Sequence, residues 1–145
     1  MKLLILRNLC AAALALMSAA VLAAPTVVVY KTPTCGCCSG WIEHMKSNGF
    51  MVNAVNVSDV SSFRRHAGVP DYMASCHTAM VDGYAIEGHV PAADVKRLLA
   101  ERPKARGLAV PGMPQSAPGM DAPGRTPYEV LLIDTSGKFT VYQRH

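Results

Sequence analysis

The hydrophobic positions from residue 26 onward follow two periodicities, one typical of strands and one typical of helices. Residues 26–30 form a continuous β-branched apolar run, which predicts a buried strand. In residues 39–48 the apolar side chains recur at helical spacing, and Gly49 follows as a helix stop. Residues 51–57 then alternate between apolar and polar side chains, which indicates a second strand.

The middle of the chain predicts a second helix followed by a hairpin. Ser58-Asp59 is suited to cap a short helix that runs to about Ala67. Residues 78–81 and 84–87 are two short strand-like runs with Asp82-Gly83 between them. Because Asp-Gly favours the tight turn whose twist matches paired strands, we expect an antiparallel hairpin here.

The last third of the chain predicts one helix, an irregular segment and a final hairpin. Pro91 stands at a helix start, and the basic residues 102–106 are interpreted as the solvated end of that helix. Residues 107–126 are so rich in proline and glycine that we expect no long regular structure there. Residues 128–134 and 138–143 then predict two strands joined by a turn.

The order strand, helix, strand, helix, strand, strand, helix is that of a small thioredoxin-like α/β domain. The Pro/Gly/Met-rich loop and the C-terminal β-hairpin are additions to it. In that fold a thiol motif lies between the first strand and the first helix, which is where Cys35-Gly36-Cys37-Cys38 stands. A helix N-terminus favours thiolate over thiol, so the position suits reactive or metal-binding sulfur.

The N-terminal segment has the pattern of a secretory signal peptide. A positively charged start is followed by an apolar run over residues 9–22 and by small residues up to Ala23. We expect residues 1–23 to be removed together with Cys10. The remaining residues 24–145 are predicted to form a single periplasmic domain with no stable membrane insertion.

The net charge and the distribution of basic residues bear on whether the protein binds nucleic acid. The full chain has a formal net charge of +4. Removal of Lys2 and Arg7 leaves 12 basic residues against 10 acidic ones. The basic residues are scattered, so nothing indicates a nucleic-acid partner. Four cysteines remain, in a compartment where disulfides form.

The cysteine cluster is the most informative feature. Cys35 and Cys38 have the spacing of dithiol redox proteins, and Cys37 adds a third sulfur that disulfide exchange does not need. Closely spaced thiolates suit soft ions, since shared sulfurs can bridge several Cu(I) ions, whereas structural zinc sites usually have two separated pairs. Spacing alone leaves three interpretations open. They are a metal site, a dithiol redox site, and a structural disulfide, either Cys35 with Cys38 or one of the three with Cys76.

Two histidines are candidates for the same site. Cys76-His77 precedes the predicted hairpin, in the loop that faces the thiol motif of a thioredoxin-like fold. His77 is either a ligand or a ring that hydrogen-bonds the loop. His89, between a strand and a helix start, is a candidate ligand, proton carrier or capping group. His44 is expected at the surface.

Met113 and Met120 occur in a repeated Pro-Gly-Met pattern within the irregular segment. A thioether is a soft neutral ligand that favours Cu(I) over zinc. The alternative is a loop that docks two apolar side chains over the domain.

The chain resembles a known family through motifs that cover almost all of residues 24–145. They are Thr32-Pro33-Thr34-Cys35-Gly36-Cys37-Cys38 with Trp41, Ser75-Cys76-His77-Thr78-Ala79, residues 81–91, 107–114 and 116–120, and Tyr128-Glu129-Val130. These motifs resemble the CopG-like family of exported copper-resistance proteins, domain of unknown function 411. The resemblance implies a thioredoxin-like domain in the periplasm and a copper site built by the Cys-x-Cys-Cys motif with further Cys, His and Met donors.

The sequence therefore predicts a periplasmic copper-binding protein for copper resistance or homeostasis. It would hold Cu(I), with room for several ions in a thiolate-bridged cluster, and would exchange copper with periplasmic copper-handling proteins. The predicted ligands are Cys35, Cys37, Cys38, Cys76, Met113, Met120, His89 and His77. The alternative is a thiol-disulfide oxidoreductase that uses Cys35 and Cys38. Whether the protein is an enzyme, through copper-linked redox chemistry, stays open.

Overall fold

The computed structural model describes residues 24–120, 122 and 126–145. The predicted signal peptide, residues 1–23, and Cys10 within it lie outside the described residues. Among the helices of the described part, none is long and apolar enough to cross a membrane.

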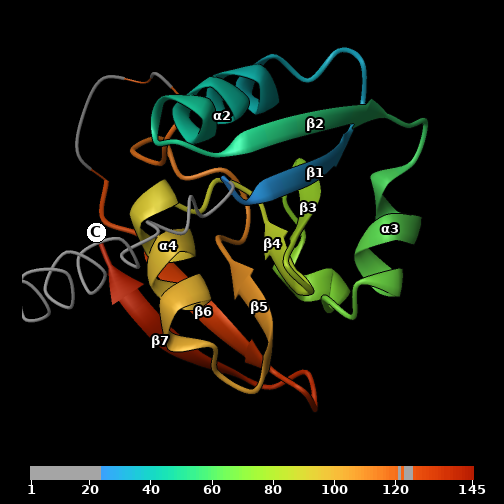
Figure 1. Ribbon diagram of the computed structural model, residues 1–145. Coiled ribbons are helices and arrows are strands. Elements are labelled where there is room, and N and C mark those ends of the chain that lie inside the picture. Colours follow the sequence, from blue (N-terminus) through green and yellow to red (C-terminus); the bar gives the residue numbers. More distant parts are fainter. Residues whose placement is uncertain (1–23, 121, 123–125) are drawn as a thin grey trace, which may run out of the picture.

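A mixed seven-stranded sheet is the frame of the molecule (Figure 1). Its spatial order is β2-β1-β3-β4-β5-β6-β7. Strand β1 is parallel to β2 and β4 is parallel to β5, whereas the other neighbouring pairs are antiparallel. The strands are β1 (Thr26–Lys31), β2 (Met51–Asn56), β3 (His77–Val81), β4 (Tyr84–Glu87), β5 (Ala105–Ala109), β6 (Glu129–Asp134) and β7 (Phe139–Arg144).

Helices cover both faces of the sheet. On one face, α2 (Gly36–Ser47) and α4 (Ala92–Glu101) bury Trp41 and Leu98 in the main hydrophobic core. On the other face, α3 (Val60–His66) stacks Phe63 on Tyr30, with ring centroids 4.2 Å apart. The short 3-10 helix η2 (Asp71–Met73) closes a smaller core on that face, where Met73 is buried. This layering places the start of α2 at the carboxyl end of β1.

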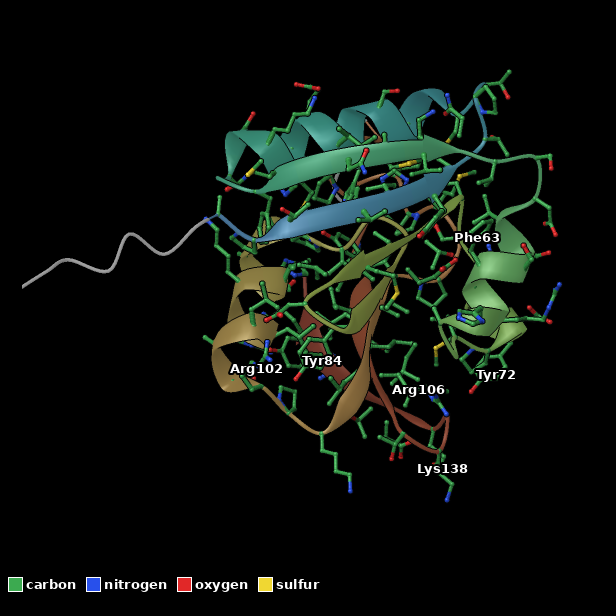
Figure 2. All side chains as sticks on the ribbon, turned by 45° about the vertical axis from the view of Figure 1, so that its right-hand side comes forward. Phe63, Tyr72, Tyr84, Arg102, Arg106 and Lys138 are labelled. Carbon is green, nitrogen blue, oxygen red and sulfur yellow. A yellow bond between two sulfur atoms is a disulfide. The ribbon has the colours of Figure 1, made fainter. Side chains whose placement is uncertain are left out.

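Side chains at the far end of the sheet tie α4 to the β3–β4 hairpin (Figure 2). The Tyr84 hydroxyl donates a hydrogen bond of 2.8 Å to the Pro103 carbonyl. Arg102 lies over the Tyr84 ring, 5.7 Å from its centroid, and pairs with Asp82 in the hairpin turn. Asp82 and Gly83 both have positive φ angles, as the predicted tight turn requires.

Most of the predicted elements are confirmed, with two differences. The first helix begins at Gly36 rather than Ser39, so that the cysteine motif forms its first turn. The segment predicted as a helix end and an irregular stretch contains strand β5. Gly107 in β5 packs so close to the Ala85 carbonyl that a Cβ atom would collide with it. This strand depends on its neighbours β4 and β6 rather than on its own propensity, which is why the local pattern does not predict it.

Candidate metal and thiol site

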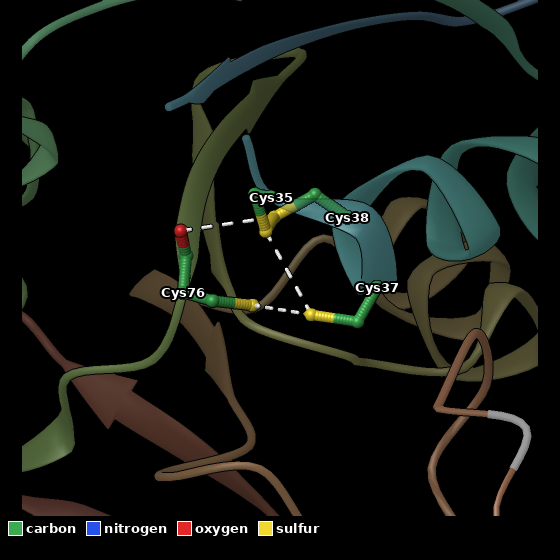
Figure 3. Close-up of side chains that lie close together, drawn as sticks. All are labelled: Cys35, Cys37, Cys38 and Cys76. Atoms are coloured by element: carbon green, nitrogen blue, oxygen red, sulfur yellow. Dashed lines mark hydrogen bonds between the residues drawn. A yellow bond between two sulfur atoms is a disulfide. The ribbon is translucent and has the colours of Figure 1, made fainter. Parts of the chain in front are cut away.

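Three cysteines lie at the beginning of α2 and the fourth lies opposite them (Figure 3). Cys35 is the residue that precedes the helix, and Cys37 and Cys38 belong to its first turn. Cys76 directly precedes β3. The first residue of β3, His77, pairs with Lys31 at the end of β1. The ends of β1 and β3 therefore bring together sulfurs that are 38 to 41 residues apart in the sequence.

Cys35 and Cys38 form a disulfide, and Cys37 and Cys76 are free thiols. The Cys37 Sγ atom lies 3.7 Å from the Cys35 Sγ atom and 3.8 Å from the Cys76 Sγ atom. All four Sγ atoms lie within 4.8 Å of one another. The arrangement is a compact set of soft donors of which two are oxidised.

The sulfurs lie in two different environments, the start of α2 and the buried position of Cys76. Within the described residues no side chain caps the N-terminus of α2, and its first turn contains no acidic residue. The N-terminus of a helix is in general a favourable place for an anionic group. Burial, together with the neighbouring Cys37, raises the pKa of the Cys76 thiol to about 12. Without metal, Cys76 is therefore a protonated thiol at neutral pH.

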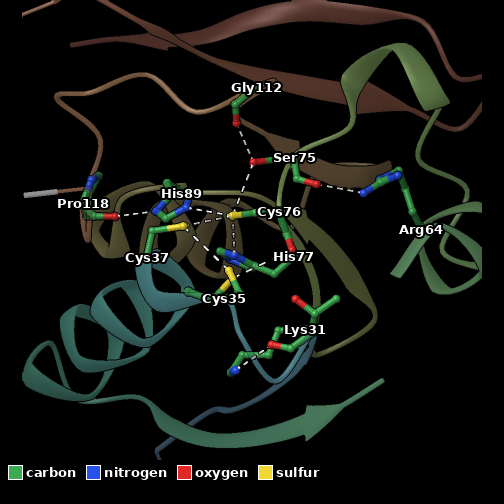
Figure 4. Close-up of a disulfide and its surroundings, with 12 residues drawn as sticks. Lys31, Cys35, Cys37, Arg64, Ser75, Cys76, His77, His89, Gly112 and Pro118 are labelled. Carbon is green, nitrogen blue, oxygen red and sulfur yellow. Dashed lines mark hydrogen bonds between the residues drawn. A yellow bond between two sulfur atoms is a disulfide. The ribbon is translucent and has the colours of Figure 1, made fainter. Parts of the chain in front are cut away.

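His89 faces Cys76 in a fixed tautomer (Figure 4). Its Nδ1 atom lies 2.7 Å from the Pro118 carbonyl, which only accepts hydrogen bonds, so Nδ1 carries the ring proton. The Nε2 atom is then an acceptor, and it lies 3.0 Å from the Cys76 Sγ atom. Burial lowers the pKa of His89, which keeps the ring neutral. A neutral imidazole held in this way has a nitrogen available to a proton or a metal ion.

His77 is fully buried beside the same sulfur. Its Nδ1 atom lies 3.5 Å from the Cys76 Sγ atom, and its ring packs against Trp41 with centroids 4.5 Å apart. Burial and the neighbouring His89 lower the pKa of His77 to about 3. Its Nε2 atom has no hydrogen-bond partner among the described residues. Cys76, His77 and His89 thus form a second group whose donor atoms lie within 4.8 Å.

The Pro-Gly-Met loop reaches the site through its backbone. The Gly112 carbonyl accepts a hydrogen bond of 2.6 Å from the Ser75 hydroxyl, next to Cys76. Gly119 packs against the backbone of Trp41 on α2. Met113 is 54% exposed, and Met120 is half-buried. The backbone of the loop therefore lies next to Ser75 and to the start of α2.

A buried ion pair holds the Cys76 loop, and sequence reasoning missed it. The Glu87 carboxylate accepts hydrogen bonds from Arg64 Nε at 2.8 Å and from the Ser75 N–H at 2.7 Å. Its other oxygen accepts from the Thr78 hydroxyl at 2.6 Å. Arg64 also donates to the Ser75 carbonyl at 2.9 Å. A charged residue on a strand of the predicted hairpin was the signal that could have found this network.

Two side chains of α2 fix the segment that carries His89. The Trp41 indole N–H donates to the Val90 carbonyl at 2.8 Å. His44 was expected at the surface but is half-buried, and its Nε2 atom accepts a hydrogen bond of 3.0 Å from the Ala92 N–H. Because Pro91 offers no capping side chain, His44 supplies the acceptor for the first turn of α4. The surface expectation for His44 was wrong because helical spacing alone did not show where α4 begins.

Comparisons with known proteins find one family model and two solved structures that are similar to this chain. Residues 73–120 match the family model described as "Protein of unknown function, DUF411". Copper resistance protein CopG in form 2 is similar with 41% sequence identity and a TM-score of 0.80, over 84% of this chain and 98% of that chain. Form 1 is similar with 42% identity and a TM-score of 0.78, over 83% and 96% of the two chains. No curated protein matches.

Proposed function

This chain belongs to the CopG-like DUF411 family, and we propose that it binds copper as part of copper resistance or homeostasis. One observation carries the proposal: four cysteine sulfurs from two distant segments lie within 4.8 Å of one another. Thiolate sulfur is a soft donor that selects soft ions such as Cu(I). The similar solved structures are of copper resistance proteins, which favours copper over other soft ions.

The ion is Cu(I), held as cargo by Cys35, Cys37, Cys38 and Cys76. An external dithiol that gives up two electrons and two protons, and itself becomes a disulfide, reduces Cys35–Cys38 to two thiols, and the donor set then contains four sulfurs. Sulfurs this close can each serve more than one ion, which supports a thiolate-bridged cluster with several copper ions. Because Cys76 is otherwise protonated, copper binding releases protons.

Neutral donors complete the site. His89 is the best supported, because the Pro118 carbonyl fixes the tautomer that leaves Nε2 available beside Cys76. His77 follows, because its Nδ1 atom lies 3.5 Å from the Cys76 Sγ atom. Met113 and Met120 are proposed as thioether donors on the loop that flanks the site.

The architecture supports a thioredoxin-like domain over residues 24–145, with an added loop and hairpin. Strands β2-β1-β3-β4 lie in that order, β1 is joined to β2 through α2, and the cysteine motif starts α2. We place the protein in the periplasm after removal of residues 1–23, where other copper-handling proteins would deliver or receive the metal. A disulfide beside a metal site is consistent with an oxidising compartment.

A second function is favoured by one observation. The Cys35–Cys38 disulfide spans the Cys-x-x-Cys pair of a dithiol oxidoreductase. In this alternative the pair exchanges its disulfide with other proteins, or bound copper cycles between Cu(I) and Cu(II). Cys37 separates the alternatives, because disulfide exchange by Cys35 and Cys38 does not require it.

An anaerobic Cu(I) titration of the fully reduced protein tests the proposal. Copper per chain is measured against a chromogenic Cu(I) chelator for wild type, Cys37→Ser and the matched control Ser39→Ala, also in α2. We expect wild type and Ser39→Ala to bind the same amount, and Cys37→Ser to bind less. The proposal is wrong if the wild-type protein binds only trace amounts of copper. A Cys37→Ser variant that matches wild type in copper while it still reduces insulin disulfides favours the oxidoreductase.

A further inference from the structure

We propose that the metal-free protein has a second disulfide site, Cys37–Cys76, and that the disulfide at the start of α2 moves between this site and Cys35–Cys38. Cys37 is the connecting sulfur. It lies in contact with one sulfur of the existing disulfide and with the remaining free thiol, at 3.7 and 3.8 Å (Figure 3). Thiol-disulfide exchange proceeds by attack of a thiolate on a disulfide sulfur, and it requires such contacts.

The first step moves the disulfide within α2. The Cys37 sulfur attacks the Cys35 sulfur, so that a Cys35–Cys37 bond forms and the Cys35–Cys38 bond breaks. The proton lost by Cys37 ends on the released Cys38 thiolate. The start of α2 favours the negative charge that passes through these sulfurs.

The second step carries the disulfide across to the β3 loop. The Cys76 sulfur attacks the Cys37 sulfur, a Cys37–Cys76 bond forms and the Cys35–Cys37 bond breaks. His89 Nε2, an acceptor 3.0 Å from the Cys76 sulfur, relays the Cys76 proton, which ends on the released Cys35 thiolate, so that the ring is neutral before and after the step. The four cysteines that the structure describes hold one disulfide and two thiols before and after, so the exchange needs no oxidant or reductant.

The consequence is a covalent link between two segments that otherwise meet by packing. In the Cys35–Cys38 form the disulfide lies within α2 and its cap residue, whereas the Cys37–Cys76 form joins α2 to the loop before β3. In both forms two sulfurs are withheld from a metal ion. If the proposed copper function holds, loading requires a dithiol partner that reduces the disulfide and becomes oxidised to a disulfide itself.

Peptide mapping of the wild-type protein tests the exchange directly. The protein is purified after expression of the full chain, stripped of metal, and equilibrated with a trace of reduced glutathione. It is then quenched in acid, alkylated and digested with trypsin. Cleavage after lysine and arginine puts Cys35, Cys37 and Cys38 in residues 32–46 and Cys76 in residues 66–96. A Cys35–Cys38 disulfide leaves these peptides separate, and a Cys37–Cys76 disulfide joins them.

We expect joined and separate peptides in wild type, and only separate peptides in Cys37→Ser. Separate peptides alone in wild type, or joined peptides that persist in Cys37→Ser, overturn the proposal. Peptide mapping is done without copper. A negative result therefore contradicts the disulfide exchange and leaves the proposed copper function untouched, and a failed Cu(I) titration leaves the disulfide exchange untouched.

A trapped pair gives a second test. In Cys35→Ser/Cys38→Ser only Cys37 and Cys76 remain at the site, and oxidised glutathione supplies the disulfide to be exchanged. Two thiols held in contact react with each other at a high effective concentration, so we expect the internal disulfide to exceed glutathione adducts by about tenfold or more. The control Cys35→Ser/Cys76→Ser keeps Cys37 without its partner and should collect adducts. Predominant glutathione adducts on both variants contradict a Cys37–Cys76 site.

Discussion

Replacement of Arg64 by methionine should destabilise the protein and weaken copper binding, although the hydrogen bonds of Arg64 go to Glu87 and Ser75 and not to the sulfurs. Arg64 and Glu87 form an ion pair in which the two side chains are 9% and 0% exposed. The substitution leaves the Glu87 carboxylate buried without its cation. Removal of one partner of a buried ion pair typically costs about 3–5 kcal/mol.

The expected cost lies at the lower end of that range, at about 3 kcal/mol, because Glu87 keeps two of its donors. The Ser75 N–H and the Thr78 hydroxyl still reach the carboxylate at 2.7 and 2.6 Å. The Ser75 carbonyl, by contrast, loses the hydrogen bond from Arg64. Since Cys76 follows Ser75, we expect the loosened loop to lower the Cu(I) affinity as well.

Urea unfolding of the reduced, metal-free protein measures the stability loss, and competition with a Cu(I) chelator measures the affinity. Arg65→Met is the matched control, because Arg65 is the next residue of α3 and is exposed. The control should change stability by less than about 0.5 kcal/mol. The reasoning is refuted if Arg64→Met costs no more than Arg65→Met, or if it lowers stability with no change in copper affinity.

Three further substitutions test the contacts around α2 and the loop. Trp41→Phe should cost about 2–3 kcal/mol in urea unfolding, because it leaves the buried Val90 carbonyl unpaired, and a loss below about 0.5 kcal/mol contradicts this. Burial lowers the pKa of His44, so its contribution is complete above the unfolded pKa and is lost as pH falls through the folded pKa. The His44→Gln variant has no titrating group at this position, so its free energy of unfolding should fall less than that of wild type between pH 7 and 5 in urea unfolding. Equal losses in the two proteins would contradict a role of His44 in this pH dependence. Gly119→Ala should destabilise more than Gly112→Ala in thermal unfolding, because both have positive φ but only the Gly119 Cβ would collide with Trp41; equal effects would remove the steric argument.

The parts of the fold that sequence predicts are those set by neighbouring residues. The β1 run, the Asp82-Gly83 turn and the Asp59 cap are all local patterns, and each is confirmed. Strand β5 is different, because a central strand with a glycine at Gly107 has little propensity of its own. Its position follows from pairing with β4 and β6, which no local pattern contains.

In the candidate site, too, some features could be predicted from the sequence and others depend on the fold. The thiols and imidazoles are recognisable from residue type and spacing, and the structure brings the four cysteines together with His77 and His89. The disulfide between Cys35 and Cys38 was one of several pairings that spacing left open. The Arg64–Glu87 support was not predicted, since it joins a helix to a strand 23 residues away and depends on the register of the sheet.

The repeated Pro-Gly-Met pattern gains an explanation that does not depend on the methionines. The Gly112 carbonyl accepts a hydrogen bond from Ser75, next to Cys76, and the Pro118 carbonyl accepts one from His89, itself a predicted ligand. Both glycines of the repeat adopt positive φ, and a side chain on Gly119 would strike α2. Proline and glycine therefore set the backbone path that fixes the His89 tautomer. If the methionines also bind copper, they do so from a loop whose position the backbone already determines.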